Sequence, residues 1–164
     1  MEKLWAPWRV KYITNIAKGL KGCIFCNIYK EKKDKKNFII IREKHAFSVL
    51  NIYPYNNGHA LIIPNRHVDD LSKLNREERE GLIDLLEETK ALLDGVMRSD
   101  GYNIGINLGK AAGAGFPDHM HIHIVPRWVG DVNFMPVTGN TKVISQSLKS
   151  LHGKLLAAYK KSKK

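Results

Sequence analysis

Short apolar runs separated by turn-forming residues dominate the pattern between residues 38 and 125. The runs are residues 38–41, 46–50, 60–63, 103–107 and 119–125. They are rich in branched or aromatic side chains, as strands are. Between the second and third runs, Pro54 and the sequence Asn56-Asn57-Gly58 favour a hairpin turn. The pattern therefore predicts about five strands.

A helical repeat replaces the strand pattern from Asn75 to Arg98. Leucines recur there at helical spacing, and Asn75 followed by Glu78 is a capping-box sequence that marks a helix start. Gly101 is a suitable terminator. Because several strands accompany one long helix, the expected fold class is α+β with a mostly antiparallel sheet. The length of 164 residues favours a single domain over residues 1–164.

The composition is that of a globular domain with an excess of positive charge. Hydrophobic residues make up 43% and charged residues 26% of the chain, which excludes disordered and collagen-like classes. The net charge of +11 favours anionic partners such as nucleotides. The basic segments at residues 31–36 and 159–164, the second a C-terminal tail, are interpreted as solvated surface.

Hydropathy gives no sign of a membrane or secretory segment. The longest apolar run is far shorter than the roughly 20 residues of a membrane-spanning helix, and the start of the chain lacks a signal-peptide pattern. We therefore expect a cytoplasmic protein without membrane association. The charge alone leaves a basic nucleic-acid-binding module open. Nucleic acid is nevertheless not an expected partner, because no stacking platform or recognition helix accompanies the charge.

The densest candidate chemistry lies in the last apolar run, where His119, His121 and His123 alternate with apolar residues. Side chains of a strand alternate between faces, so the three imidazoles are expected on one face. One interpretation is the metal site of a zinc-dependent hydrolase, although neither Asp118 nor Asp131 is well placed as a further ligand. In the other, the middle imidazole is a nucleophile that attacks phosphorus and forms a covalent phosphoramidate.

Two further motifs extend the candidate site. In the glycine-rich loop before the histidines, backbone amides such as those of Gly113 and Gly115 can approach phosphate oxygens, and Lys110 adds a positive charge. The only cysteines, Cys23 and Cys26, have the spacing of a metal half-site or a redox pair. The loop and the histidines together favour phosphoryl or nucleotidyl transfer.

Three segments carry a resemblance to a known family. They are residues 119–125 (HMHIHIV), residues 58–68 (GHALIIPNRHV) and residues 23–26 (CIFC). The first fits the His-φ-His-φ-His-φ-φ signature of the histidine triad superfamily, in which φ is apolar. From Leu4 to about Leu148 the chain resembles the branch of diadenosine tetraphosphate phosphorylases, and it is also similar to fragile-histidine-triad hydrolases. This resemblance implies a HIT-like fold and an enzyme that acts on nucleotides.

The resemblance also implies roles for the histidines. His121 would attack the α-phosphorus of a nucleotide or dinucleoside polyphosphate and form a nucleotidyl-histidine intermediate. His123 would donate a hydrogen bond to the phosphate. His59 would position His121 by accepting a hydrogen bond from its other nitrogen. These three are the expected catalytic residues.

The substrate-binding residues expected from the resemblance and the loop lie on both sides of the triad. Asn51 is expected to bind the ribose and Asn107 the substrate phosphates. Gly113 and Gly115 would offer backbone amides to the phosphates, and Trp128 would close the site.

A structural zinc ion is also implied by the resemblance. Its four ligands would be two thiolates and two imidazoles, from Cys23, Cys26, His67 and His119. No organic cofactor is expected, while Mg²⁺ can arrive with the substrate. The family further implies a homodimer.

Residues of the glycine-rich loop leave the type of reaction open. Ala114-Gly115 stands where phosphorylase relatives often carry Gly-Ser, and the glutamine of the hydrolases is absent from this loop. Phosphorolysis of a dinucleoside polyphosphate is slightly favoured. Hydrolysis of the polyphosphate bridge and hydrolysis of nucleoside phosphoramidates are the alternatives.

Overall fold

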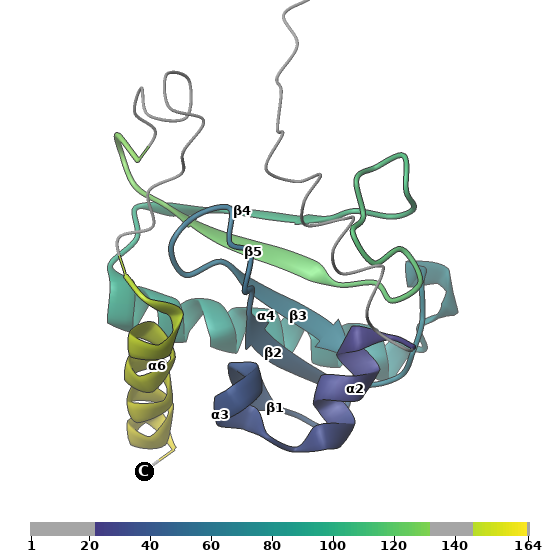
Figure 1. The fold of residues 1–164 in the computed structure, drawn as a ribbon, viewed down its shortest axis with the longest axis horizontal. Coiled ribbons are helices and arrows are strands. Elements are labelled where there is room, and N and C mark those ends of the chain that lie inside the picture. Colours follow the sequence, from purple (N-terminus) through teal and green to yellow (C-terminus); the bar gives the residue numbers. More distant parts are fainter. Residues whose placement is uncertain (1–21, 132–145, 164) are drawn as a thin grey trace, which may run out of the picture.

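The five strands of the sheet are arranged in an order that differs from their order in the sequence. A computed structural model describes residues 22–131 and 146–163 (Figure 1). Residues 1–21, 132–145 and 164, which include the start of the stretch that carries the resemblance, lie outside the described residues. The strands are β1 (Ile39–Arg42), β2 (Ala46–Leu50), β3 (Ala60–Pro64), β4 (Gly101–Ile106) and β5 (Ile122–Arg127).

The sheet has the order β1-β2-β3-β5-β4. In this order β5 lies between β3 and β4, and β4 is at an edge of the sheet. Each pair of neighbouring strands is antiparallel. After β3 the chain forms a long helix and then the edge strand β4. It then returns as β5, which lies between β3 and β4. The predicted α+β fold with an antiparallel sheet of five strands is confirmed.

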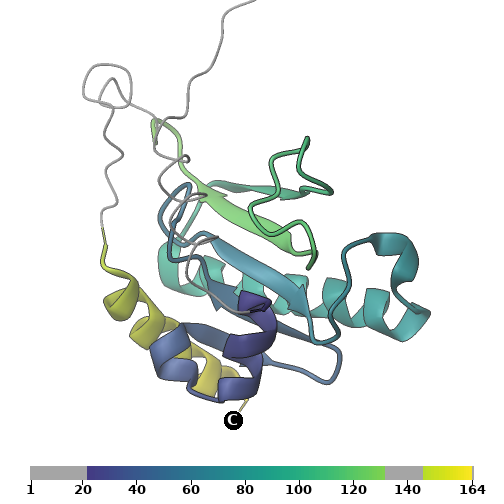
Figure 2. The same cartoon turned by 45° about the vertical axis from the view of Figure 1, so that its right-hand side comes forward.

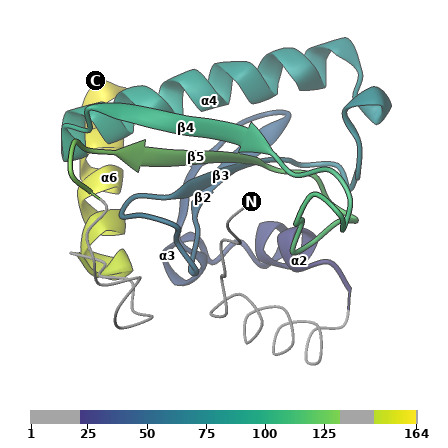
Figure 3. The same ribbon diagram turned by 90° about the horizontal axis from the view of Figure 1, so that it is seen from above.

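Helix α4 (Arg76–Met97) runs along one face of the sheet (Figure 3). It begins with the predicted capping box, because Asn75 and Glu78 each accept a hydrogen bond from the backbone N–H of the other. Its buried leucines pack against strand side chains such as Ile62 and Ile124 in the main core. The helix ends at Met97, and the C-cap residue Arg98 adopts a left-handed conformation with φ of 49°. The predicted terminator Gly101 is instead the first residue of β4.

The structure also contains helices that the pattern of apolar residues does not predict. α2 (Ile24–Glu31) and α3 (Asp34–Asn37) lie on the sheet face opposite α4, and α6 (Leu148–Ser162) stands beside one end of α4 (Figures 2 and 3). A short 3-10 helix, η1 (Leu71–Lys73), precedes α4. α2 buries a single residue, Phe25, and the buried residues of α6 cluster in little more than one turn. Such short stripes give a weak periodic signal, so the sequence predicts one helix where the structure has several.

The C-terminal basic tail is more ordered than the sequence suggests. α6 continues through Ser162, and Nζ of Lys163 lies 2.9 Å from the carboxylate of Glu88 on α4. Residues 160–163 are exposed, as expected of a solvated segment. Among the described helices, none combines the length and apolar character needed to cross a membrane.

Strand β5 begins later than the histidine pattern predicts. The prediction covers residues 119–125, whereas the β3–β5 ladder ends at the pair Ile62 and Ile122. Pro64, at the end of β3, has no N–H to continue this ladder, and its carbonyl oxygen lies 3.0 Å from Nε2 of His119. His119 and His121 therefore precede the strand, and His123 alone of the three belongs to it.

Gly58 lies in the turn between β2 and β3 with a φ of 77°, in the left-handed region. A Cβ at this position would lie 2.9 Å from Cε of Met97 and 3.1 Å from Cγ of Pro126. We expect Gly58→Ala to lower the free energy of unfolding by about 1–3 kcal/mol, as measured by urea denaturation.

The matched control is Gly95→Ala, within α4, where an added Cβ meets nothing within 4 Å. Because alanine favours a helix over glycine, this control is expected to raise the free energy of unfolding by about 0.5–1 kcal/mol. Equal losses in both variants would contradict the role assigned to Gly58.

Candidate active site and metal centre

The histidines gather on the sheet face that α4 does not cover. Phe25 and Leu61 belong to a second apolar cluster on that face, and Leu61 pairs with His123 across the β3–β5 ladder. The ring centroid of Phe25 lies 5.5 Å from that of His119 and 5.0 Å from that of His121. The rings of His121 and His123 are 4.8 Å apart. The three imidazoles thus share one side, as their alternation in the sequence suggests.

His121 is buried, with 5% of its surface exposed. Its Nδ1 lies 3.0 Å from the backbone carbonyl oxygen of His119. A carbonyl only accepts, so Nδ1 carries the hydrogen and the lone pair of the neutral ring is on Nε2. Burial lowers the pKa of His121 below its usual value, which favours this neutral form. A neutral ring with a free lone pair on Nε2 can act as a nucleophile.

The prediction that His59 accepts a hydrogen bond from His121 is wrong. Nδ1 of His121 donates to the carbonyl of His119, and the partner of His59 is another ring. Nε2 of His59 lies 2.9 Å from Nδ1 of His123. The register explains this difference: Leu61 pairs with His123, so His59, two residues earlier on the same face, comes closer to His123 than to His121.

A backbone amide determines the hydrogen positions of His59 and His123. The N–H of Tyr55 donates to Nδ1 of His59 over 3.0 Å, so the hydrogen of the His59 ring must be on Nε2. This Nε2–H faces Nδ1 of His123 and donates to it. The hydrogen of the His123 ring is therefore on Nε2. His123 is half-buried and presents this N–H beside the ring of His121.

Two predicted substrate-binding residues border these rings. Nδ2 of Asn107 lies 3.5 Å from Nε2 of His123. Because that ring nitrogen carries a hydrogen, the amide oxygen of Asn107 is the atom suited to face it. The side-chain oxygen of Asn51 accepts the N–H of Tyr53 over 2.9 Å, and its Nδ2 lies 3.4 Å from Nδ1 of His59. Asn51 follows β2 and Asn107 follows β4, so the two flank the triad.

Two of the other predicted substrate-binding residues, Gly113 and Trp128, form hydrogen bonds with backbone carbonyls. The N–H of Gly113 donates to the carbonyl of Lys110 over 3.0 Å, within the glycine-rich loop. Gly115 is exposed in the same loop. Trp128 comes directly after the C-terminal end of β5, whereas His123 lies near the start of this strand. The indole N–H of Trp128 donates to the carbonyl of Arg98 over 3.2 Å.

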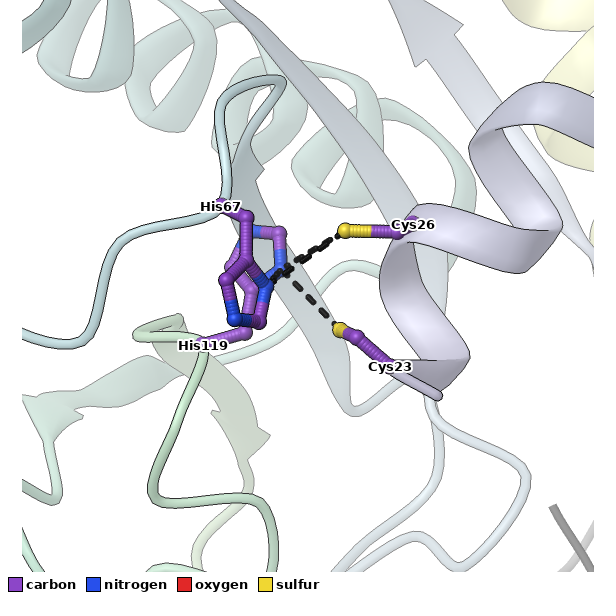
Figure 4. Close-up of side chains that lie close together, drawn as sticks. All are labelled: Cys23, Cys26, His67 and His119. Carbon is purple, nitrogen blue, oxygen red and sulfur yellow. Dashed lines mark hydrogen bonds between the residues drawn. The ribbon is translucent and has the colours of Figure 1, made fainter. Parts of the chain in front are cut away.

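The four predicted metal ligands converge from separate segments (Figure 4). The ligand atoms of Cys23, Cys26, His67 and His119 all lie within 4.8 Å of one another. Nδ1 of His119 is 3.2 Å from Sγ of Cys23, 3.6 Å from Sγ of Cys26 and 3.2 Å from Nδ1 of His67. A zinc tetrahedron with ordinary bond lengths has edges of about 3.3–3.8 Å, so the donor set fits this ion.

The surroundings of His119 suit a metal ligand. Its Nε2 donates to the carbonyl of Pro64 over 3.0 Å, which leaves the lone pair on Nδ1 facing the sulfur atoms. Burial is the main reason that the pKa of His119 falls to about 4, so the ring is neutral. Burial and the neighbouring Cys23 thiol raise the pKa of the Cys26 thiol, and a bound cation would oppose this by stabilising the thiolate.

The composition of this group bears on the alternatives left open by the sequence. Both cysteines are free thiols that face imidazoles, which favours a metal half-site over a redox pair. Four protein ligands leave no open position for water or substrate, as is typical of structural rather than catalytic zinc. Within residues 22–131 and 146–163, His121 and His123 take part in no candidate metal group.

Sequence reasoning missed Tyr55 and the double role of His119. The ring of Tyr55 stacks on that of His59 with centroids 4.7 Å apart, in addition to the hydrogen bond of its amide. The ring of His119 belongs to the metal group, while its carbonyl fixes the hydrogen of His121. The bond from the Tyr55 amide and the bond to the His119 carbonyl involve backbone groups, which leave no mark in a side-chain motif.

Comparisons with known proteins agree with this geometry. The family model described as HIT domain matches residues 32–129. The AP-4-A phosphorylase of Mycobacterium tuberculosis is 34% identical over 156 residues, which cover 91% of this chain and 80% of that protein. Adenosine 5'-monophosphoramidase HNT1 of Saccharomyces cerevisiae is 38% identical over 106 residues, which cover 65% of this chain and 63% of that protein.

A solved structure extends the agreement to the fold. The zinc-bound histidine triad family protein from Mycobacterium smegmatis matches with a TM-score of 0.69 and 26% identity, and the match covers 87% of this chain and 96% of that one. The family model itself spans more than half of the sequence and includes all three histidines of the triad. The chain therefore belongs to the HIT domain family.

Proposed function

We propose that this protein is a nucleotide phosphorylase or hydrolase that cleaves dinucleoside polyphosphates such as diadenosine tetraphosphate. The observation that carries the proposal is the lone pair on Nε2 of His121 beside the N–H on Nε2 of His123. Substitution at phosphorus needs a nucleophile and a hydrogen-bond donor for the oxygens that gain charge. The relatives named as AP-4-A phosphorylase and as adenosine monophosphoramidase support this substrate class.

In the first step, Nε2 of His121 attacks the α-phosphorus. A P–N bond forms as the P–O bond to the leaving polyphosphate breaks. Nε2–H of His123 would turn from the side-chain oxygen of Asn107 to the phosphate oxygens and donate a hydrogen bond to them as their charge increases. The positive charge that develops on the His121 ring is stabilised at Nδ1–H by the carbonyl of His119, 3.0 Å away.

In the second step, phosphate or water attacks the same phosphorus and releases the His121 ring unchanged. With diadenosine tetraphosphate, attack by phosphate gives ADP and ATP, and attack by water gives AMP and ATP. We favour phosphorolysis, because the relative named as AP-4-A phosphorylase matches 91% of the chain. Hydrolysis of nucleoside phosphoramidates is a second candidate, favoured by the identity of 38% to the monophosphoramidase over a shorter stretch.

Product analysis separates these reactions. Diadenosine tetraphosphate is incubated with the protein, with and without inorganic phosphate, beside adenosine phosphoramidate as a second substrate. We expect ADP and ATP to appear only when phosphate is present. AMP with ATP in both samples would establish hydrolysis instead, and turnover of the phosphoramidate alone would establish the second candidate. Cleavage of neither substrate would overturn the proposed function.

We propose zinc as the metal of the Cys₂His₂ group. The ion would be held by the four side chains whose ligand atoms lie within 4.8 Å of one another, and it would supply a cross-link between segments distant in the sequence. α2 provides the cysteines at its start, His67 follows β3, and His119 precedes β5. The relative described as zinc-bound supports this choice.

The remaining expectations complete the proposal. Asn51 would bind ribose and Asn107 phosphate, with Mg²⁺ carried by the substrate and no organic cofactor. A homodimer could form along β4, an edge strand on which Ile104 is 49% exposed. The roles of Gly113, Gly115 and Trp128, the homodimer and the cytoplasmic location stay predictions.

A further inference from the structure

The turn between β2 and β3 determines which ring nitrogen carries the hydrogen in His59 and in His123. Within this turn, the N–H of Tyr55 fixes Nδ1 of His59 as an acceptor. The donor on Nε2 of His59 then fixes Nδ1 of His123 as an acceptor. Each ring can keep its contact only as the neutral Nε2–H tautomer. Any group that holds the turn in place therefore also affects the tautomer of His123, through the contacts of Tyr55 with His59 and of His59 with His123.

Asn56, next to Tyr55, anchors this turn to the C-terminal end of β5, whereas His123 lies near the N-terminal end of that strand. Its Nδ2 donates to the carbonyl of Pro126 over 3.1 Å and to Oδ2 of Asp131 over 2.8 Å. Its Oδ1 accepts the N–H of Asn57 over 3.0 Å. Both hydrogens of the amide and its oxygen are therefore engaged, and the turn is tied to the strand that carries His123.

Asp131 is itself held firmly. The guanidinium of Arg127 donates to both carboxylate oxygens, over 2.6 Å and 2.7 Å, and the N–H of Trp128 donates over 3.1 Å. Only 8% of the Asp131 side chain is exposed. A bidentate pair of this kind fixes direction as well as distance. The carboxylate thus offers Asn56 an acceptor at a defined position.

We propose that Asn56 and Asp131 are positioning residues that keep His123 as a hydrogen-bond donor towards the substrate. Asp131 holds Asn56, Asn56 holds the turn, and the Tyr55 amide then orients His59 and, through it, His123. The kinetic part of this inference rests on the proposed function. The arrangement of the rings does not, because it can be observed without substrate.

The experiment compares Asn56→Ala with the matched variant Asn65→Ala. Asn65 also ties down a turn, with Nδ2 donating to the carbonyls of Glu43 and Lys44, both over 3.0 Å, and neither of these bonds reaches a triad ring. The first readout is NMR of isotope-labelled histidine rings, which detects the coupling across the hydrogen bond between His59 and His123. The second is the steady-state kinetics of diadenosine tetraphosphate cleavage.

We expect Asn56→Ala to lose the coupling and to lower kcat about tenfold while KM stays within about twofold. Asn65→Ala should keep both the coupling and kcat. The inference is overturned if the coupling survives in Asn56→Ala, or if Asn65→Ala loses it as well. If the wild-type protein cleaves no nucleotide, the proposed function fails, and the NMR comparison still decides the role of Asn56.

A second variant covers the case in which Asn56→Ala does not fold. Asp131→Asn keeps the shape and one oxygen of the side chain but removes the charge that holds Arg127 and Asn56. We expect a weaker coupling between His59 and His123 in this variant, with a smaller fall in kcat. An unchanged coupling in folded Asp131→Asn would remove Asp131 from the proposed chain of contacts.

Discussion

Replacing His121 with asparagine should lower kcat for diadenosine tetraphosphate by at least about 10³-fold, because the variant has no nucleophile. The Asn amide can still donate to the carbonyl of His119, as Nδ1 of His121 does over 3.0 Å. What it lacks is the lone pair at the position of Nε2. Nucleotide affinity is therefore expected to stay within about twofold, measured by calorimetric titration.

The covalent intermediate gives an independent measurement for the same variant. A substrate labelled at the α-phosphorus should transfer label to the wild-type protein, detectable after quenching without acid, because acid cleaves a P–N bond. His121→Asn should retain none. Equal labelling of both proteins, or turnover of the variant near the wild-type rate, would move the nucleophile to another residue.

With zinc bound in the Cys₂His₂ group, as proposed, removing the ion should destabilise the fold much more than it impairs the chemical step. Free zinc at about 100 times its Kd stabilises the bound protein by about 2.7 kcal/mol. For a chain of this length, a chelator should then lower the melting temperature by about 5–10 °C in scanning calorimetry. The physical reason is that Cys23, Cys26, His67 and His119 join segments separated by up to 96 positions in the sequence.

The double variant Cys23→Ser, Cys26→Ser is the control for chelation. It should melt at the lower temperature whether or not a chelator is present. At a temperature where the metal-free protein is still folded, turnover should continue, because the proposed steps use His121 and His123. Immediate loss of turnover in a folded, metal-free protein would support the zinc-hydrolase interpretation instead.

Local sequence patterns predicted the elements whose periodic signal is long or strongly alternating. The leucine repeat and the Asn75–Glu78 capping box located α4, and the short apolar runs located the strands to within a few residues. α2 and α6 were missed because each buries too few residues to give a clear period. The start of β5 was misplaced because the ladder ends near Pro64, a residue of the neighbouring strand.

The candidate site divides in the same way. Alternation along residues 119–123 determined that the three rings share a side, and the motif resemblance indicated which side chains form the metal group. Only the tertiary structure decided that His59 contacts His123, that the His119 carbonyl orients His121, and that Tyr55 sets the tautomers. Periodicity depends on neighbours along the chain, whereas these contacts depend on the register between strands and on backbone groups, which the order of residues does not display.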